Sequence, residues 1–272
     1  MSTKPVHGKE GTVGRKRADD ASLHIRTGDR GLALGFFYGV SLCFCRLFAL
    51  LFLDVRMLHV DRVPRKGAVV LAGNHQSFFD PLLVGACLDR RACYLARETL
   101  FRVPVLGWLL KRYDCLPVPR ESMAPRKALE ICVRVLQKGR ALVLFPEGTR
   151  SRAGRLQPLK RGITLVARRS GAPVLPILIR GTYALWPRDK FLPRPGKVQI
   201  IYGHPLTIDP TESADSFMDR LSCAYRHLAV EVGAYEVLPE EETADDESRA
   251  GEGSEPQAPP SPMISEEPSV LL

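Results

Sequence analysis

The sequence predicts an α/β fold with a mixed, largely parallel central sheet flanked by helices, preceded by an N-terminal membrane-embedded helical segment. Short, nearly continuous apolar runs recur after residue 60, and amphipathic stretches of helical period lie between them. An uncharged apolar run from residue 31 predicts the membrane segment. We expect four parts: a flexible basic N-terminus at 1–30, a membrane-associating helical segment at 31–58, an α/β domain at 59–234 and an acidic disordered tail at 235–272.

The apolar segment is at the limit of what can cross a bilayer. Fifteen residues from Gly31 to Cys45 carry no charge, Arg46 interrupts the run, and Leu47–Leu53 adds seven more apolar residues. A spanning helix needs about 20 largely apolar residues, and an arginine near the middle of the bilayer makes insertion unfavourable in free energy. The segment therefore fits either a single N-terminal anchor or a monotopic attachment.

The strands of the α/β domain are expected where apolar runs end at glycine, proline or charge. Several of these runs are nearly continuously apolar, which indicates strands that are covered on both faces. We expect strands at 67–73, 92–97, 141–145, 172–179 and 197–203.

Helices are expected between these strands. The stretch 122–139 has Ala128, Ile131, Cys132 and Val135 on one face, and ends at a glycine. The stretch 160–171 has the same kind of ending, and further helices are expected at 214–232 and after Asp80, with Asp80 as the cap and Pro81 in the first turn.

Charge is distributed unevenly along the chain. The net charge is +9, but the segment from Tyr235 to Leu272 contains eleven acidic residues and one arginine, so residues 1–234 carry +19. A basic body indicates an anionic partner such as nucleic acid, a membrane surface or a phosphorylated substrate. The seven cysteines lie in apolar surroundings without a C-x-x-C pair, which indicates reduced thiols facing the cytosol and neither disulfides nor a zinc site.

His75 and Asp80 lie five residues apart in GNHQSFFDP, directly after the first predicted strand. Histidine is the usual general base at neutral pH, and a carboxylate on its second ring nitrogen orients it. Since no nucleophilic serine or cysteine motif is present, the nucleophile is expected to be a substrate hydroxyl that His75 deprotonates. Taken alone, the pair also fits an ordinary helix cap and a loop histidine.

The run FPEGTR at 145–150 follows the strand expected at 141–145. Its glutamate precedes a glycine turn, and Arg150 and Arg152 follow on the same loop. Arginine binds phosphate in a bidentate manner, and Glu147 can orient an arginine or accept from a substrate hydroxyl. Because loops at the carboxyl ends of parallel strands meet at one edge of a sheet, both motifs can form one site.

Asn74, His75, Ser77 and Asp80, followed by FPEGTR, resemble the motifs of the glycerophospholipid acyltransferases, most closely the 1-acylglycerol-3-phosphate (lysophosphatidic acid) acyltransferases. The resemblance covers about residues 55–205 and implies a glycerol-3-phosphate acyltransferase-like fold, with the acyltransferase domain at 59–234. The stretch that begins at Arg97, with Gly107 and Arg120, resembles the family's second block, although the family often has lysine at the first of these positions. The strand around Pro176 resembles the fourth block.

The resemblance implies transfer of an acyl group from acyl-CoA or acyl carrier protein to the free glycerol hydroxyl of lysophosphatidic acid, giving phosphatidic acid. It implies His75 as base and Asp80 as its orienting partner, with no metal and no organic cofactor. The residues that it implies for binding the acceptor's phosphate and glycerol are Arg97, Arg120, Glu147, Gly148, Thr149, Arg150 and Lys160.

Other functions fit parts of the sequence. Within the family, the acceptor can be glycerol 3-phosphate or another lysophospholipid. In a different class, the chain can be a catalytically idle lipid-binding adaptor at the membrane. Nucleic-acid binding is disfavoured, because basic and aromatic residues are not interleaved and an apolar segment is present. We expect a membrane enzyme on the cytoplasmic face, with membrane lipid, a lysophospholipid acceptor and a thioester donor as partners.

Overall fold

The computed structural model describes residues 39–40, 43, 47, 52–86, 88–118, 124–187, 190 and 192–239. The expected N-terminus at 1–30, Arg120, most of the expected membrane segment and most of the acidic tail lie outside these residues. Within the described part of the chain, no helix combines the length and the apolar character that crossing a membrane requires.

The described residues form a seven-stranded sheet in the order β1-β7-β6-β2-β5-β3-β4. All neighbouring pairs are parallel except β6 and β7, which are antiparallel, so the mixed, largely parallel sheet is confirmed. The strands are β1 (Leu53–Leu58), β2 (Val69–Gly73), β3 (Ala92–Arg97), β4 (Cys115–Val118), β5 (Ala141–Leu144), β6 (Val174–Arg180) and β7 (Gly196–Tyr202).

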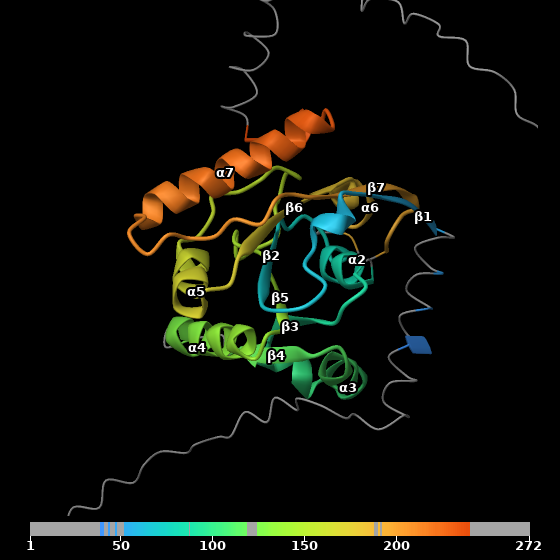
Figure 1. The fold of residues 1–272 in the computed structure, drawn as a ribbon. Helices are drawn as coiled ribbons and strands as arrows, with labels where there is room; N and C mark the ends of the chain where they lie inside the picture. The colour runs from blue at the N-terminus through green and yellow to red at the C-terminus, as the bar shows by residue number, and fades with distance from the viewer. Residues whose placement is uncertain are drawn as a thin grey trace, which may run out of the picture.

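Helices cover both faces of the sheet, as Figure 1 shows, with α2, α3 and α6 on one side and α4, α5 and α7 on the other. Short 3-10 turns η1 (Val60–Arg62), η2 (Glu98–Arg102) and η3 (Tyr235–Val237) connect or follow them. The helices are α2 (Asp80–Ala86), α3 (Pro104–Arg112), α4 (Ala124–Gln137), α5 (Gly162–Ser170), α6 (Thr182–Leu185) and α7 (Ala214–Glu231).

Each face of the sheet has its own apolar core. Side chains of α4, α5 and α7, among them Val135, Val166 and Phe217, pack on one face. Side chains around α2, including Phe79 and Leu83, pack on the other. The central strand β2 is buried along its whole length, as expected for a strand covered on both faces. The helix expected at 122–139 is confirmed by α4, whose Cys132 and Val135 are buried.

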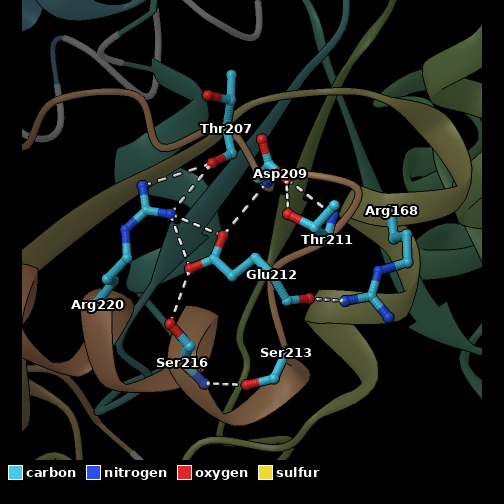
Figure 2. A network of polar contacts seen from close by, with 8 residues as sticks. All are labelled: Arg168, Thr207, Asp209, Thr211, Glu212, Ser213, Ser216 and Arg220. Carbon is cyan, nitrogen blue, oxygen red and sulfur yellow. Dashed lines mark hydrogen bonds and ion pairs between the residues drawn. The ribbon is translucent and has the colours of Figure 1, made fainter.

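The long helix α7 is tied to its neighbours at its N-terminus, where a polar network surrounds Glu212 (Figure 2). Ser213 caps the helix by accepting a hydrogen bond from the Ser216 amide. Both carboxylate oxygens of Glu212 accept from Arg220, which holds the pKa of that carboxyl below its usual range. Arg168 at the end of α5 donates to the Glu212 carbonyl, so this network joins two helices of the same layer.

The structure differs from the expected elements in three respects. Residues 53–58 were expected to end a helical membrane segment, but they form strand β1, paired with β7. Helix α3 and strand β4 are not among the elements that periodicity predicts, although the family resemblance implies a short strand before Arg120, where β4 lies. The domain does not end at 234, because Val237 and Leu238 are buried in the core that α7 covers. These additions enlarge the sheet and leave the central strands as expected.

Candidate active site

His75 and Asp80 lie side by side at the carboxyl end of β2. The His75 Nδ1 atom lies 2.9 Å from an Asp80 carboxylate oxygen, which also accepts from the backbone amides of Gln76 and Ser77, at 2.7 Å each. The Asp80 side chain is fully buried, whereas the imidazole is 18% exposed. With Nδ1 held, Nε2 is the ring nitrogen left to meet a substrate.

Asp80 does not act as the expected helix cap. Helix α2 begins at Asp80 itself, and its carboxylate accepts from the loop at 75–77 that precedes the helix. An ordinary cap accepts from amides further along the helix. The hydroxyl of Ser77 accepts from the Phe79 amide and donates to the Trp186 carbonyl. The carboxylate therefore closes a tight turn that holds His75 in place.

The FPEGTR loop after β5 fixes the backbone of His75 from both sides. One Glu147 oxygen accepts from the His75 amide at 2.9 Å, and the Ser151 amide donates to the His75 carbonyl at 2.7 Å. The Phe145 ring stacks on the imidazole, with the ring centroids 4.1 Å apart and an interplanar angle of 21°. The two sequence motifs thus form one structural unit although they are 72 residues apart.

Glu147 is almost completely buried, at 3% exposure. Its pKa is raised to about 8, mainly because burial removes the carboxylate from water; the nearby Asp80 adds to the rise, while hydrogen bonds from the His75 and Gln157 amides oppose it. Its second carboxyl oxygen has no hydrogen-bond partner among the described residues. A protonated Glu147 brings no second negative charge next to Asp80 and still accepts from the His75 amide.

Replacement of Glu147 by glutamine is expected to change how stability depends on pH. The wild-type carboxyl keeps its proton in the folded state up to about pH 8, whereas the unfolded chain loses it near pH 4.5. The folded state therefore binds more protons in this window, and the free energy of unfolding falls as pH rises through it. Glutamine does not titrate, so Glu147→Gln should gain stability relative to wild type by up to about 1.4 kcal/mol per pH unit.

Urea unfolding of both proteins at pH 5, 6, 7 and 8 measures this difference. Gln157→Ala is the matched control, since it changes a neighbouring polar side chain without removing a titrating group. Parallel pH profiles for wild type and Glu147→Gln would show that Glu147 is already ionised at pH 5.

Cationic groups surround the FPEGTR turn. The guanidinium carbon of Arg150 lies 3.5 Å from the centroid of the Phe78 ring, so this arginine is stacked on the loop that carries His75. Lys160 crosses Gly148, which has φ +72°, and a Cβ at that glycine would lie 2.5 Å from the lysine Nζ atom. The Thr149 hydroxyl donates to the Gln157 side chain. Gly148 therefore allows both the turn and the close approach of Lys160.

The other expected site residues have different positions. The Asn74 side chain donates to the Ile179 carbonyl and accepts from its amide, so it continues the pairing of β2 with β6 and has a structural task. Arg97 is exposed at the end of β3, at the same edge of the sheet but two strands from β2, or about 10 Å. Arg120 lies outside the described residues.

Several contacts were not predicted. Contacts with His75 come from Ser151 and Phe145, and a contact with Arg150 comes from Phe78. In each pair, the two residues lie far apart in the sequence. Tyr225 of α7 is fully buried and donates to the Ala72 carbonyl, three residues before His75. Of these residues, Phe78 and Phe145 lie within the two motifs GNHQSFFDP and FPEGTR, which was a signal in the sequence. Among the described residues, no group of three or more His, Cys, Asp or Glu side chains is arranged to hold a metal ion.

Comparison with known proteins finds an acyltransferase domain and several similar enzymes. A protein-family model described as Acyltransferase matches residues 54–180, which include both motifs. The chain is similar to 1-acyl-sn-glycerol-3-phosphate acyltransferases in sequence and in fold. It is 34% identical over 141 residues to the chloroplastic 1-acyl-sn-glycerol-3-phosphate acyltransferase BAT2 of Brassica napus, covering 50% of this chain and 40% of that one.

Two further enzymes are similar over different lengths. The Bacillus subtilis 1-acyl-sn-glycerol-3-phosphate acyltransferase is 29% identical over 153 residues, covering 56% of this chain and 73% of that one. The crystal structure of the 1-acyl-sn-glycerophosphate acyltransferase PlsC from Thermotoga maritima matches with a TM-score of 0.60 and 28% identity, over 75% of this chain and 83% of that one. The chain spans less than half the length of its Brassica, Arabidopsis and Cocos relatives.

Proposed function

We propose that this acyltransferase transfers a fatty acyl group from a thioester donor to the free glycerol hydroxyl of lysophosphatidic acid, giving phosphatidic acid. The observation that carries the proposal is the unit formed by His75, Asp80 and Glu147, with Arg150 stacked beside it. The named activity of several relatives, 1-acyl-sn-glycerol-3-phosphate acyltransferase, supports the same acceptor.

In this mechanism His75 acts as general base. Its Nε2 atom takes the proton of the acceptor hydroxyl as the oxygen attacks the thioester carbonyl. Asp80 accepts from Nδ1, which keeps the proton off the reacting nitrogen and stabilises the imidazolium that forms. The tetrahedral intermediate then expels the thiolate, which takes the proton from the imidazolium, and the ester is complete. The reaction as proposed uses acyl-CoA or acyl carrier protein as co-substrate and needs no metal or organic cofactor.

The acceptor is held by the second loop. Arg150 binds the phosphate through its planar guanidinium, whose orientation the Phe78 ring supports. Lys160, next to Gly148, adds positive charge on the other side of the turn, and Thr149 offers a hydroxyl. Glu147 does not bind the acceptor in this scheme; it accepts a hydrogen bond from the His75 backbone amide and so holds the base in position. Arg97 and Arg120 complete the proposed set of phosphate-binding cations.

We further propose that the protein acts at the membrane. The apolar segment that begins at residue 31 is expected to attach the enzyme, as a single anchor or a monotopic contact, with the site facing the cytoplasm. Three of the described residues before β1, Val40, Leu47 and Phe52, are exposed apolar side chains in helical conformation.

Thiol release from palmitoyl-CoA by the purified, detergent-solubilised protein tests the proposal. Lysophosphatidic acid, glycerol 3-phosphate and lysophosphatidylcholine are offered separately, with His75→Ala as control. Release that requires both lysophosphatidic acid and His75 is the expected result. Release with a different acceptor would keep the chemistry and change the substrate. Absence of release with all three acceptors, repeated with acyl carrier protein as donor, would favour an idle lipid-binding adaptor.

A further inference from the structure

The surface of η2 and α3 exposes an unusual group of apolar side chains. Val105 is 79% exposed, Val103 is 49% exposed and Trp108 is 48% exposed. Leu100 and Pro104, in the same stretch of chain, are also exposed. We call these five residues the η2–α3 surface. Single exposed apolar residues are common, but five within nine positions form a patch of the kind that binds a partner.

Helix α3 contributes little to the interior of the described domain. Neither apolar core cluster contains any of its side chains, although both contain side chains from other helices of the domain. The helix is held mainly against η2 and the edge strand β4. Gly107 makes this possible, since a Cβ there would lie 2.2 Å from the Phe101 carbonyl oxygen. The sequence thus fixes α3 to the edge of the sheet, where Leu106, Leu109 and Leu110 are half-buried while Val105 and Trp108 are exposed.

Basic side chains surround the η2–α3 surface. Arg102 and Lys111 are exposed at its two ends, and the Arg112 guanidinium lies 4.5 Å from the centroid of the Trp108 ring. Between residues 97 and 112 four basic residues accompany a single acidic one, Glu98. Tryptophan beside arginine, with aliphatic residues at the tip, is the composition found where proteins meet the headgroup layer of a bilayer.

The position of this surface relates it to the active site. Turn η2 starts at the carboxyl end of β3, the same edge of the sheet where β2 leads into His75 and β5 leads into Phe145. Helix α2, which carries exposed Leu82, lies on the same side of the sheet as α3 (Figure 1). A flat partner touching η2 and α3 would therefore lie along the edge of the sheet that carries His75.

We propose that the η2–α3 surface is a membrane contact of the α/β domain, separate from the N-terminal segment, and that it inserts Val105 and Trp108 among anionic phospholipids. The net positive charge around it selects anionic headgroups. This contact orients the domain so that the His75 edge faces the bilayer. It does not depend on which acceptor the site uses, so it is independent of the proposed reaction.

Tryptophan fluorescence of the full chain on vesicles tests this contact. The chain contains two tryptophans, so Trp186→Phe leaves Trp108 as the single reporter. Vesicles are made of phosphatidylglycerol and phosphatidylcholine, with bromine on the acyl chains of the quenching lipid. Flotation confirms that every variant is bound. We expect bromolipid to quench Trp108 and the vesicle to shield it from aqueous acrylamide.

The matched control places a tryptophan on the opposite layer. Leu165 of α5 is 47% exposed, nearly the same as Trp108, and α5 lies on the other side of the sheet. Leu165→Trp in a chain carrying Trp108→Phe and Trp186→Phe should be quenched by acrylamide and not by bromolipid. In the Trp108 reporter, Val105→Glu should reduce bromolipid quenching about fivefold, because it puts an anion against the headgroups.

Two results would overturn the proposal. The first is a Trp108 that acrylamide quenches as strongly as the tryptophan introduced on α5 in the control, while bromolipid has no effect. The second is a Trp108 that acyl carrier protein shields in solution but that bromolipid does not quench, since this would make the surface a docking site for an acidic protein. Because neither measurement requires turnover, an inactive enzyme that still shows quenching would reject the proposed reaction and support the contact.

Discussion

His75→Ala is expected to reduce the rate of acyl transfer on the order of 10³-fold, the largest effect of any single substitution in this chain. The substitution removes the only group placed to take the proton from the acceptor in the proposed mechanism. The fold should survive, because the imidazole is partly exposed and the Asp80 oxygen keeps its two backbone donors from Gln76 and Ser77. Thiol release at saturating donor and acceptor measures the rate, and thermal unfolding measures stability.

A second histidine serves as the control for this experiment. His204 is exposed just after β7, which runs antiparallel to β6, so it lies at the sheet edge opposite to His75. His204→Ala should retain wild-type activity and similar stability. If His75→Ala is folded and keeps more than about a tenth of wild-type activity, proton transfer by His75 contributes less than general bases usually do, and another base must be sought.

The central strands could be predicted because burial on both faces leaves a clear pattern in the sequence. Strand β2 and strand β6 are apolar along nearly their whole length and end at glycine or charge, so their positions follow from composition. Edge strands lack this pattern. Strand β1 has one buried residue, Leu53, and directly follows an apolar run, so the sequence alone predicts it as the end of that run. Strand β4 has four residues, one of them proline.

The site could be predicted in part for a similar reason. The spacing of His75 and Asp80 determines a local turn, and local geometry is accessible from sequence. Glu147 was expected to bind an arginine or a substrate, whereas the structure shows it on the His75 amide. Such a contact depends on the order of strands in the sheet, because β2 and β5 are neighbours while their sequences are far apart. The spacing of residues along the sequence does not reveal the order of strands in the sheet.

Arg150→Ala is expected to lower kcat/KM for lysophosphatidic acid by on the order of 10²-fold, in keeping with the loss of a charge-assisted pair to phosphate. The effect should depend on the acceptor. For a monoacylglycerol, which has no phosphate, the same substitution should change kcat/KM little. Arg150→Lys should recover only part of the loss, because an ammonium keeps the charge but not the planar fork that stacks on Phe78.

The ratio of kcat/KM for the two acceptors separates phosphate binding from general damage to the site, since a distorted His75 would slow both reactions equally. Arg152→Ala is the matched control: its side chain is exposed on the same loop, and its carbonyl, which accepts from Tyr183, is unchanged by the substitution. An Arg150→Ala enzyme that retains its preference for the phosphorylated acceptor would move phosphate recognition to the other side of the turn. Lys160, which crosses Gly148, would then be the cation to replace next.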